Sequence, residues 1–186
     1  MVWACNALRM SRVCIFCGAH AGTNEHYRLL AAEVAGAIHA AGFGIVYGGG
    51  RIGLMGSLAD AMLALGGEVV GVIPRGLATT EVAHPGVDAM HVVASMHERK
   101  ALMADLSDSF IALPGGYGTM DEFHEILTWR QLRIHDKPIG LLNTGGFYDD
   151  LIALYERMLG EGFITQPARR LFSSAPDIAT LLAQMR

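Results

Sequence analysis

The sequence has few charged residues and few cysteines for its length. Only 17% of the 186 residues are Asp, Glu, Lys or Arg, and 52% are hydrophobic, whereas a charged share of about 25% is usual. That balance excludes a disordered chain and predicts a large buried core. Three cysteines are too few for a disulfide framework, so a cytoplasmic, reducing location is expected. No apolar run is long enough for a membrane-spanning helix, and the first ten residues lack the apolar stretch of a signal peptide.

Several motifs that indicate a particular chemistry are also missing from the sequence. It contains no GxxxxGK[ST] loop, no GxSxG elbow and no HExxH or Cys/His cluster, so neither a metal nor a cofactor is expected. Cys14 and Cys17 form a CxxC within a predicted strand, where two buried core cysteines are the expected interpretation. The net charge of −4 gives no reason to expect nucleic acid as a partner, and no membrane partner is expected either.

Short apolar runs alternate along the chain with longer helical patterns. Strands that are apolar throughout, each followed by a helix, are typical of a parallel sheet covered on both faces. The sequence therefore predicts an α/β fold with a Rossmann-like, doubly wound parallel sheet. We expect a single nucleotide-binding domain over 12–186, preceded by an N-terminal extension over 1–11. The six predicted strands are 12–18, 43–48, 68–74, 90–94, 109–115 and 138–143, and the helices are 25–41, 54–65, 96–107, 120–132, 148–159 and 177–185.

Glycine is abundant, with 23 residues, and two clusters of it follow predicted strands. Gly48–Gly53 fits GxGxxG, but a dinucleotide site also needs an acid at the end of the next strand, and Glu68 stands at that strand's start. Even if this loop binds no dinucleotide, glycines such as Gly49 let backbone N–H groups approach an anion. A tight strand-to-helix turn without a ligand is the alternative.

The second cluster runs from Pro114 to Glu122 and reads PGGYGTMDE. Its glycines free the backbone to wrap a phosphate, and Thr119 adds a hydroxyl. Thr119 and Glu122 also have the spacing of a capping box, with Thr119 as N-cap of a helix that starts at Met120. Capping alone would explain Glu122, whereas acids gathered beside a glycine loop favour a chemical role.

Cations gather at the same predicted edge of the sheet. A capping box at Ser95–Glu98 starts a helix, which places Arg99 and Lys100 at the positive end of its dipole. Arg51 and Arg75 also follow strands. Because stability favours acids at a helix start, these four cations predict a phosphate or nucleotide pocket, although solvated surface charges are the alternative.

Three segments together resemble one known family. Pro114–Glu122, Met96–Lys100 and Val46–Gly56 are similar, in order and spacing, to the Lonely Guy family of cytokinin riboside 5′-monophosphate phosphoribohydrolases, long mislabelled as lysine decarboxylases. The similarity spans roughly Arg12–Phe172. The sequence departs from the family at Ala19-His20, where members usually carry small hydroxyl residues.

The resemblance implies hydrolysis of the N-glycosidic bond of an adenosine 5′-monophosphate, N6-modified in the family's substrates, to free base and ribose 5-phosphate. It implies that Arg99 and Glu122 are catalytic, that a nucleoside 5′-monophosphate is the small-molecule partner, and that the protein is a homodimer. The implied substrate-binding residues are Gly49, Glu81, Arg99, Lys100, Gly115, Gly116, Tyr117, Gly118, Thr119, Asp121, Glu122 and Thr128.

Two other functions are the alternatives to this hydrolase. A non-catalytic carrier of a nucleotide or of the molybdenum cofactor would share the fold and the glycine loops, but binding alone does not require the pair of Arg99 and Glu122. A pyridoxal-dependent lysine decarboxylase would need a cofactor-binding lysine. Only Lys100 and Lys137 are present, and neither stands in a recognisable setting for that cofactor.

Overall fold

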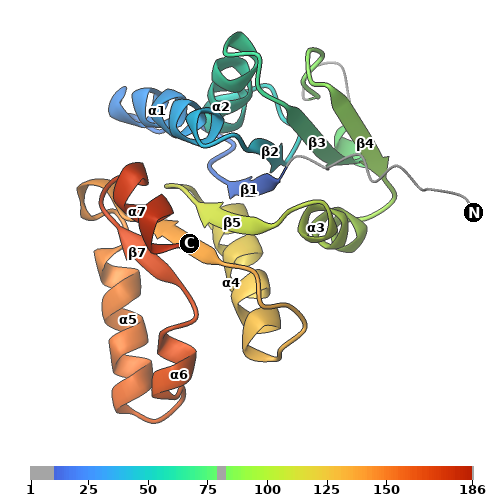
Figure 1. The fold of residues 1–186 in the computed structure, drawn as a ribbon. Coiled ribbons are helices and arrows are strands. Elements are labelled where there is room, and N and C mark those ends of the chain that lie inside the picture. Colours follow the sequence, from blue (N-terminus) through green and yellow to red (C-terminus); the bar gives the residue numbers. More distant parts are fainter. Residues whose placement is uncertain (1–10, 79–82, 186) are drawn as a thin grey trace, which may run out of the picture.

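The computed structural model describes residues 11–78 and 83–185. Within them, seven parallel strands form one sheet, and helices cover both of its faces (Figure 1). The strands are β1 (Arg12–Phe16), β2 (Gly44–Tyr47), β3 (Val69–Pro74), β4 (Ala89–Val93), β5 (Ser109–Ala112), β6 (Ile139–Leu142) and β7 (Ser173–Ala175). The helices are α1 (His26–Ala40), α2 (Gly53–Ala64), α3 (Met96–Asp105), α4 (Tyr117–Gln131), α5 (Asp149–Gly160), α6 (Gln166–Arg169) and α7 (Ile178–Gln184). The predicted single, doubly wound domain is confirmed.

The strand order β4-β3-β2-β1-β5-β6-β7 contains one reversal of direction. The chain moves outward from β1 to β4, returns to the other side of β1 as β5, and then continues to β7. In open parallel sheets, ligands bind in the crevice outside the carboxyl ends of the strands at such a switch point. The topology therefore predicts a ligand site at the carboxyl ends of β1 and β5.

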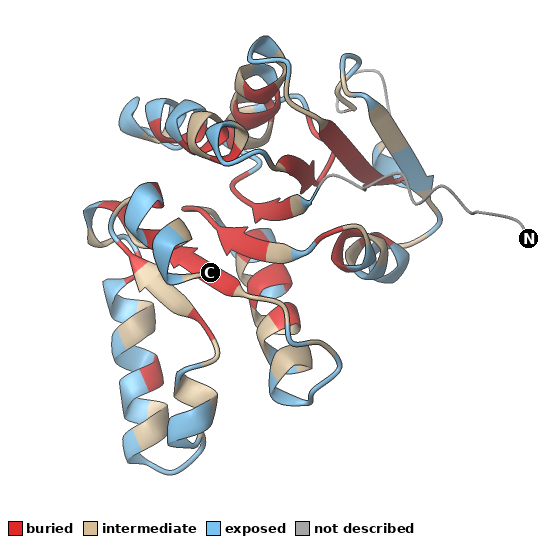
Figure 2. Cartoon of the chain, viewed as in Figure 1, coloured by how far each residue is buried: buried red, intermediate tan, exposed pale blue. Residues whose placement is uncertain are grey.

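Alternate residues of the inner strands enter two different cores. Ile15 and Ile45 face α1, α2 and α7, whereas Phe16 and Val46 face α3, α4 and α5. Strands buried on both faces read as continuous apolar runs, which is why the sequence predicted them. The inner strands are buried along their lengths, and β4 at one edge of the sheet is only partly covered (Figure 2).

Two boundaries differ from the sequence-based expectation. The short strand β7, with the sequence SSA, was not predicted, because it is neither long nor apolar enough to produce a pattern. Helix α4 begins at Tyr117, three residues before the predicted start at Met120. Residues 1–10 lie outside the described residues, so the extension over 1–11 stays a prediction. Among the described residues, no helix combines the length and the apolar character needed to cross a membrane.

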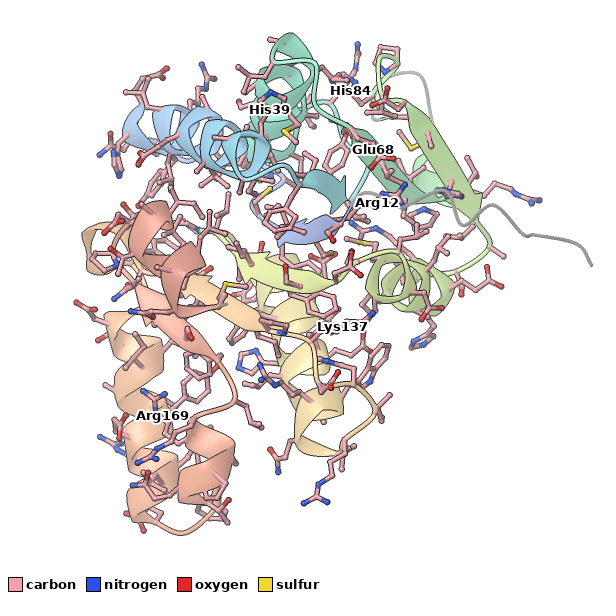
Figure 3. All side chains as sticks on the ribbon, in the orientation of Figure 1. Arg12, His39, Glu68, His84, Lys137 and Arg169 are labelled. Carbon is pink, nitrogen blue, oxygen red and sulfur yellow. The ribbon has the colours of Figure 1, made fainter. Side chains whose placement is uncertain are left out.

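Glu68 lies at the amino edge of the sheet, where its carboxylate pairs with Arg12 (Figure 3). The Arg12 Nε donates to Glu68 Oε2 at 2.8 Å, and Nη2 donates to Oε1 at 2.5 Å. A ribose-binding acid of a dinucleotide site belongs at the opposite, carboxyl edge. Glu68 therefore joins β1 to the start of β3, and the GxGxxG match does not indicate a dinucleotide site.

Candidate active site

A cavity of about 690 Å³ opens at the carboxyl ends of β1, β2, β3 and β5. It lies at the switch point between β1 and β5, where the topology predicts a ligand site. The loops that follow these four strands form most of its wall. Its volume is within the range of about 300–1,000 Å³ that is usual for small-molecule sites.

Arg99 and Glu122 meet in this cavity. Arg99 Nη1 lies 2.9 Å from Glu122 Oε1, and the two residues are only 9% and 8% exposed. The Arg99 Nε donates to the Val72 carbonyl of β3 at 3.0 Å, which fixes the guanidinium against the end of the sheet. Helices α3 and α4, which follow different strands, therefore bring a cation and an acid together in one partly enclosed space.

Gly48 leaves the room that this arrangement needs. A Cβ at Gly48 would overlap Arg99 Nη2 and would lie 3.0 Å from the Met55 sulfur. No other residue type would therefore fit at the end of β2 without displacing the guanidinium. The first glycine of the Gly48–Gly53 cluster thus makes room for the side chain of Arg99.

The charge state of Glu122 reflects its surroundings. Burial raises the pKa of Glu122 above its ordinary value, and the nearby guanidinium of Arg99 opposes that shift. The charge of Asp121 acts in the same direction as burial. Glu122 is thus a carboxyl group held close to a cation in a largely apolar cavity, which is a setting typical of catalytic acids.

The predicted capping box at Thr119 is wrong. Gly116 is the N-cap of α4, so Thr119 is the third helical residue, and among the described residues no side chain caps the start of this helix. The Thr119 side chain is buried and fills the space that a Cβ at Gly115 would need. The capping box at Ser95 is confirmed, because the Ser95 hydroxyl accepts from the Glu98 N–H at 3.1 Å.

An uncapped helix start leaves backbone N–H groups directed at the cavity. The first N–H groups of any helix lack an intrahelical partner, and Gly116, Tyr117, Gly118 and Thr119 all line the cavity. The start of α2 also lies at the cavity, but its Leu54 N–H donates to the Gly18 carbonyl at 3.2 Å. The N-terminus of α4 is therefore the better anion site of the two.

Three residues proposed to bind the nucleotide lie elsewhere. Asp121 and Thr128 line a second hollow, on the outer face of α4, together with Met120, His124, Glu125 and Trp129. The Lys100 ammonium lies 3.1 Å from Asp121 Oδ2 and 3.0 Å from Glu125 Oε2, beside that hollow. The structure therefore separates Lys100, Asp121 and Thr128 from the residues around Arg99.

The remaining predicted residues divide as follows. Gly49 lies between two lining residues and adopts a positive φ of 76°, and its carbonyl accepts from the His84 N–H at 2.9 Å, so it shapes the turn. Glu81 lies outside the described residues. Of the four predicted cations, Arg99 is the one that lines the cavity within the described ranges, and Arg51 and Arg75 are exposed.

Several lining residues escaped the sequence-based prediction. They are mostly apolar or aromatic side chains from five different loops and helices: His20, Tyr27, Ile52, Leu77 and Phe147. Phe147 comes from the turn after β6, and its ring meets that of Tyr27 edge-on at 6.1 Å. The rule that ligands bind at the carboxyl ends of strands predicts which loops line the cavity. It does not predict which of their side chains do.

Neither lysine is placed for pyridoxal chemistry. The Lys100 ammonium is held by two carboxylates, and Lys137 Nζ donates to the Ala104 carbonyl at 2.8 Å. Neither side chain lines the cavity in the described part of the chain. In residues 11–78 and 83–185, no group of three or more His, Cys, Asp or Glu side chains is arranged to hold a metal ion.

Comparison with known proteins decides the family. A family model described as "Possible lysine decarboxylase" matches residues 55–185. A probable cytokinin riboside 5′-monophosphate phosphoribohydrolase of Oryza sativa subsp. japonica is 46% identical over 179 residues, which cover 96% of this chain and 73% of the relative. The chain belongs to the phosphoribohydrolase family. A second member, the cytokinin riboside 5′-monophosphate phosphoribohydrolase LOG1 of Arabidopsis thaliana, is 45% identical over 95% of this chain and 83% of its own length.

The resemblance to the Lonely Guy phosphoribohydrolases is thereby confirmed. Among solved structures, the molybdenum cofactor carrier protein from Chlamydomonas reinhardtii superposes with a TM-score of 0.71. It is 23% identical, and the match covers 95% of this chain and 96% of that one. At that identity, the likeness shows that this chain and the carrier share a fold, and it carries no argument about function.

Proposed function

We propose that this protein hydrolyses the N-glycosidic bond of an N6-modified adenosine 5′-monophosphate. Water adds its hydroxyl to C1′ of the ribose, the bond from C1′ to the base breaks, and the base leaves with a proton. The products are the free base and ribose 5-phosphate. The observation that carries the proposal is the Arg99–Glu122 pair beside the uncapped start of α4 in one cavity.

The reaction explains why an acid stands in this cavity. As the glycosidic bond breaks, positive charge develops on the ribose, and a carboxylate beside the sugar stabilises that charge or orients the attacking water. We assign this work to Glu122. Arg99 opposes the upward effect of burial on the pKa of Glu122, because its guanidinium lies 2.9 Å from the carboxylate.

The start of α4 supplies an anchor for the 5′-phosphate. Gly115–Thr119 is a glycine-rich turn that leads into the free N–H groups and the positive dipole end of a helix of 15 residues. An anchored phosphate positions the sugar and contributes binding energy to the chemical step. Apolar side chains such as Ile52, Met55 and Phe147 make the rest of the cavity wall suitable for the base.

Product analysis across a panel of substrates tests the proposal. The panel comprises AMP, isopentenyl-AMP, the two matching nucleosides and GMP, each scored for free base and ribose 5-phosphate. We expect the nucleotides to exceed their nucleosides by at least about 10²-fold in kcat/KM, because the anchored phosphate contributes several kcal/mol. Binding of a nucleotide without release of base would favour a carrier and contradict the proposal.

We also propose that the protein is a homodimer. By their resemblance to the family, Lys100, Asp121 and Thr128 contact the nucleotide, yet they lie beside the hollow on the outer face of α4. A second copy that brought this face against the cavity of the first would place Lys100, Asp121 and Thr128 beside the nucleotide in that cavity. Tyr117 supports this arrangement, because it is 97% exposed at the rim of the cavity.

Thr128→Lys tests the dimer, with Ala179→Lys on the opposite face as its matched control. Both residues are exposed, so both variants should fold. Thr128→Lys should sediment as a monomer and lose most of its activity, because a long charged side chain would lie in the interface. Ala179→Lys should behave as the wild type. A Thr128→Lys variant that stays dimeric and active would contradict the arrangement.

The expected cytoplasmic location forms part of the proposal. Cys14 and Cys17 are buried free thiols, and burial raises the pKa of both well above the ordinary value for a thiol. Such thiols are poorly reactive and behave as small apolar side chains. They therefore give no sign of a redox function.

A further inference from the structure

The hydrogen-bond ladder between β1 and β5 changes register where the two strands part. The Leu113 N–H donates to the Phe16 carbonyl at 2.8 Å, as a parallel ladder requires. In a continued ladder, the next donor, the Gly18 N–H, would reach the Leu113 carbonyl. It donates instead to the Pro114 carbonyl at 3.3 Å. The ladder therefore leaves the Leu113 carbonyl without its backbone partner.

Tyr148 supplies the missing donor. Its hydroxyl donates to the Leu113 carbonyl at 2.6 Å, across 35 residues of sequence. The ring is only 3% exposed and packs edge-on against Phe147, with 4.8 Å between the ring centres. The Tyr148 N–H donates to Asn143 Oδ1 at 2.7 Å, which fixes the start of α5. Burial raises the pKa of Tyr148, so the hydroxyl keeps its proton.

The carbonyl that Tyr148 holds stands next to the proposed phosphate anchor. Leu113 is followed directly by Pro114 and by the Gly115–Thr119 turn that starts α4. A buried carbonyl without a partner is costly, so losing the hydroxyl would favour rotation of the Leu113–Pro114 peptide toward another donor. Since proline restricts its own φ, that rotation would be passed to Gly115.

We propose that Tyr148 is a positioning residue for phosphate binding: through the Leu113 carbonyl it sets the orientation of the Gly115–Thr119 turn. The inference rests on the proposed function, because it takes that turn as the phosphate anchor. It assigns a role to the loop after β6, which contributes Phe147 to the cavity wall and Tyr148 to the anchor's support.

Calorimetric binding of ribose 5-phosphate and of adenine to Tyr148→Phe tests this role. The phosphorylated sugar uses the anchor and the base does not. We expect the Kd of ribose 5-phosphate to rise about tenfold, which is typical of one lost hydrogen bond, while the Kd of adenine stays within a factor of two. Amide hydrogen exchange of Gly116–Thr119 should speed up in the same variant.

Tyr47→Phe is the matched control. Tyr47, at the end of β2, is also a buried tyrosine, but its hydroxyl has no hydrogen-bond partner in the described part of the chain. The control should change neither Kd nor amide exchange. Equal weakening of both ligands in Tyr148→Phe, or unchanged binding and exchange, would overturn the inference. A wild-type protein that binds no ribose 5-phosphate would overturn the proposed function and this inference with it.

Discussion

One arginine–glutamate pair lies at the amino ends of the strands and another at their carboxyl ends, and the two pairs have different roles. Arg12 and Glu68 meet at the amino edge, where two hydrogen bonds join β1 to the start of β3. Arg99 and Glu122 meet at the carboxyl edge, in a cavity bounded by glycine-rich loops. The same two residue types thus stabilise the sheet in one pair and form the proposed reactive pair in the other. The surroundings of each pair decide which role it has.

The two pairs differ in whether they line the cavity and in the geometry of their hydrogen bonds. The Arg12 guanidinium uses Nε and Nη2 on one carboxylate, which is the bidentate arrangement that suits stability. Arg99 divides its donors between the Val72 carbonyl and one oxygen of Glu122. Arg99 therefore holds Glu122 through one carboxylate oxygen, and both side chains line the cavity.

Removing the two carboxylates separately should distinguish the pairs most strongly. Glu122→Gln should lower kcat by roughly 10³-fold or more, because it removes the negative charge that faces the developing cation. It should stay folded by circular dichroism, since the amide oxygen still accepts from Arg99.

Glu68→Gln should show the reverse pattern. Its kcat should match the wild type, while its free energy of unfolding should fall by about 1–2 kcal/mol, a value reduced for the partial exposure of the pair. Urea denaturation and steady-state kinetics on the two variants provide the measurements. A Glu122→Gln variant with wild-type kcat would reduce Glu122 to a structural residue.

Gly48→Ala should show the next largest effect. The added methyl group overlaps Arg99 Nη2, so the guanidinium must move away from Glu122. We expect a loss of about 10²-fold in kcat/KM, as for other small misplacements of catalytic groups. Gly36→Ala, in open space within α1, should leave activity intact and stabilise the protein by about 0.5–1 kcal/mol. Wild-type activity in Gly48→Ala would contradict the positioning of Arg99.

These contrasts also show what the sequence could predict. Apolar strands buried on both faces produced a clear pattern, so the sheet, the single domain and the edge that carries the site were all predicted. Arg99 and Glu122 were identified from their motifs. The start of α4 was misplaced, because Thr119 and Glu122 have the spacing of a capping box, and the sequence alone does not show that the Thr119 side chain packs against Gly115.

The positions of Lys100 and Asp121 relative to the cavity could not be predicted from the motifs either. Lys100 and Asp121 are neighbours in sequence of Arg99 and Glu122, and the motifs did not show that successive residues of a helix face different directions. Lys100 and Asp121 face the outer hollow, whereas Arg99 and Glu122 face the cavity. Phe147 and Tyr148 carried no signal, since a short turn after β6 has no motif that marks it as part of a site.

The smallest expected effect concerns how kcat/KM depends on pH through the ionisation of Glu122. Burial raises its pKa, the charge of Asp121 adds to that shift, and Arg99 opposes both. Because Glu122 acts as a carboxylate, kcat/KM should fall as the pH drops through this raised value, above the usual value of about 4.3 for a glutamate. Asp121→Asn removes one cause of the shift, so the acid limb should move to lower pH.

In Asp121→Asn the acid limb of kcat/KM should shift by a fraction of a pH unit. Both proteins should be measured on the same nucleotide, so that titration of its phosphate affects them equally. Movement of the limb to higher pH would contradict the electrostatic account. The equivalent change at the amino edge, Asp108→Asn beside Arg12, should leave the limb where it is.

The central claim is that one cavity holds a nucleotide with its phosphate at the start of α4 and its glycosidic bond beside Glu122. A crystal structure of Glu122→Gln with uncleaved AMP tests this claim most directly. We predict phosphate oxygens within hydrogen-bond distance of backbone N–H groups in Gly116–Thr119, and C1′ of the ribose next to the side chain at position 122. A nucleotide bound with its phosphate elsewhere, or with its ribose remote from position 122, would contradict the account.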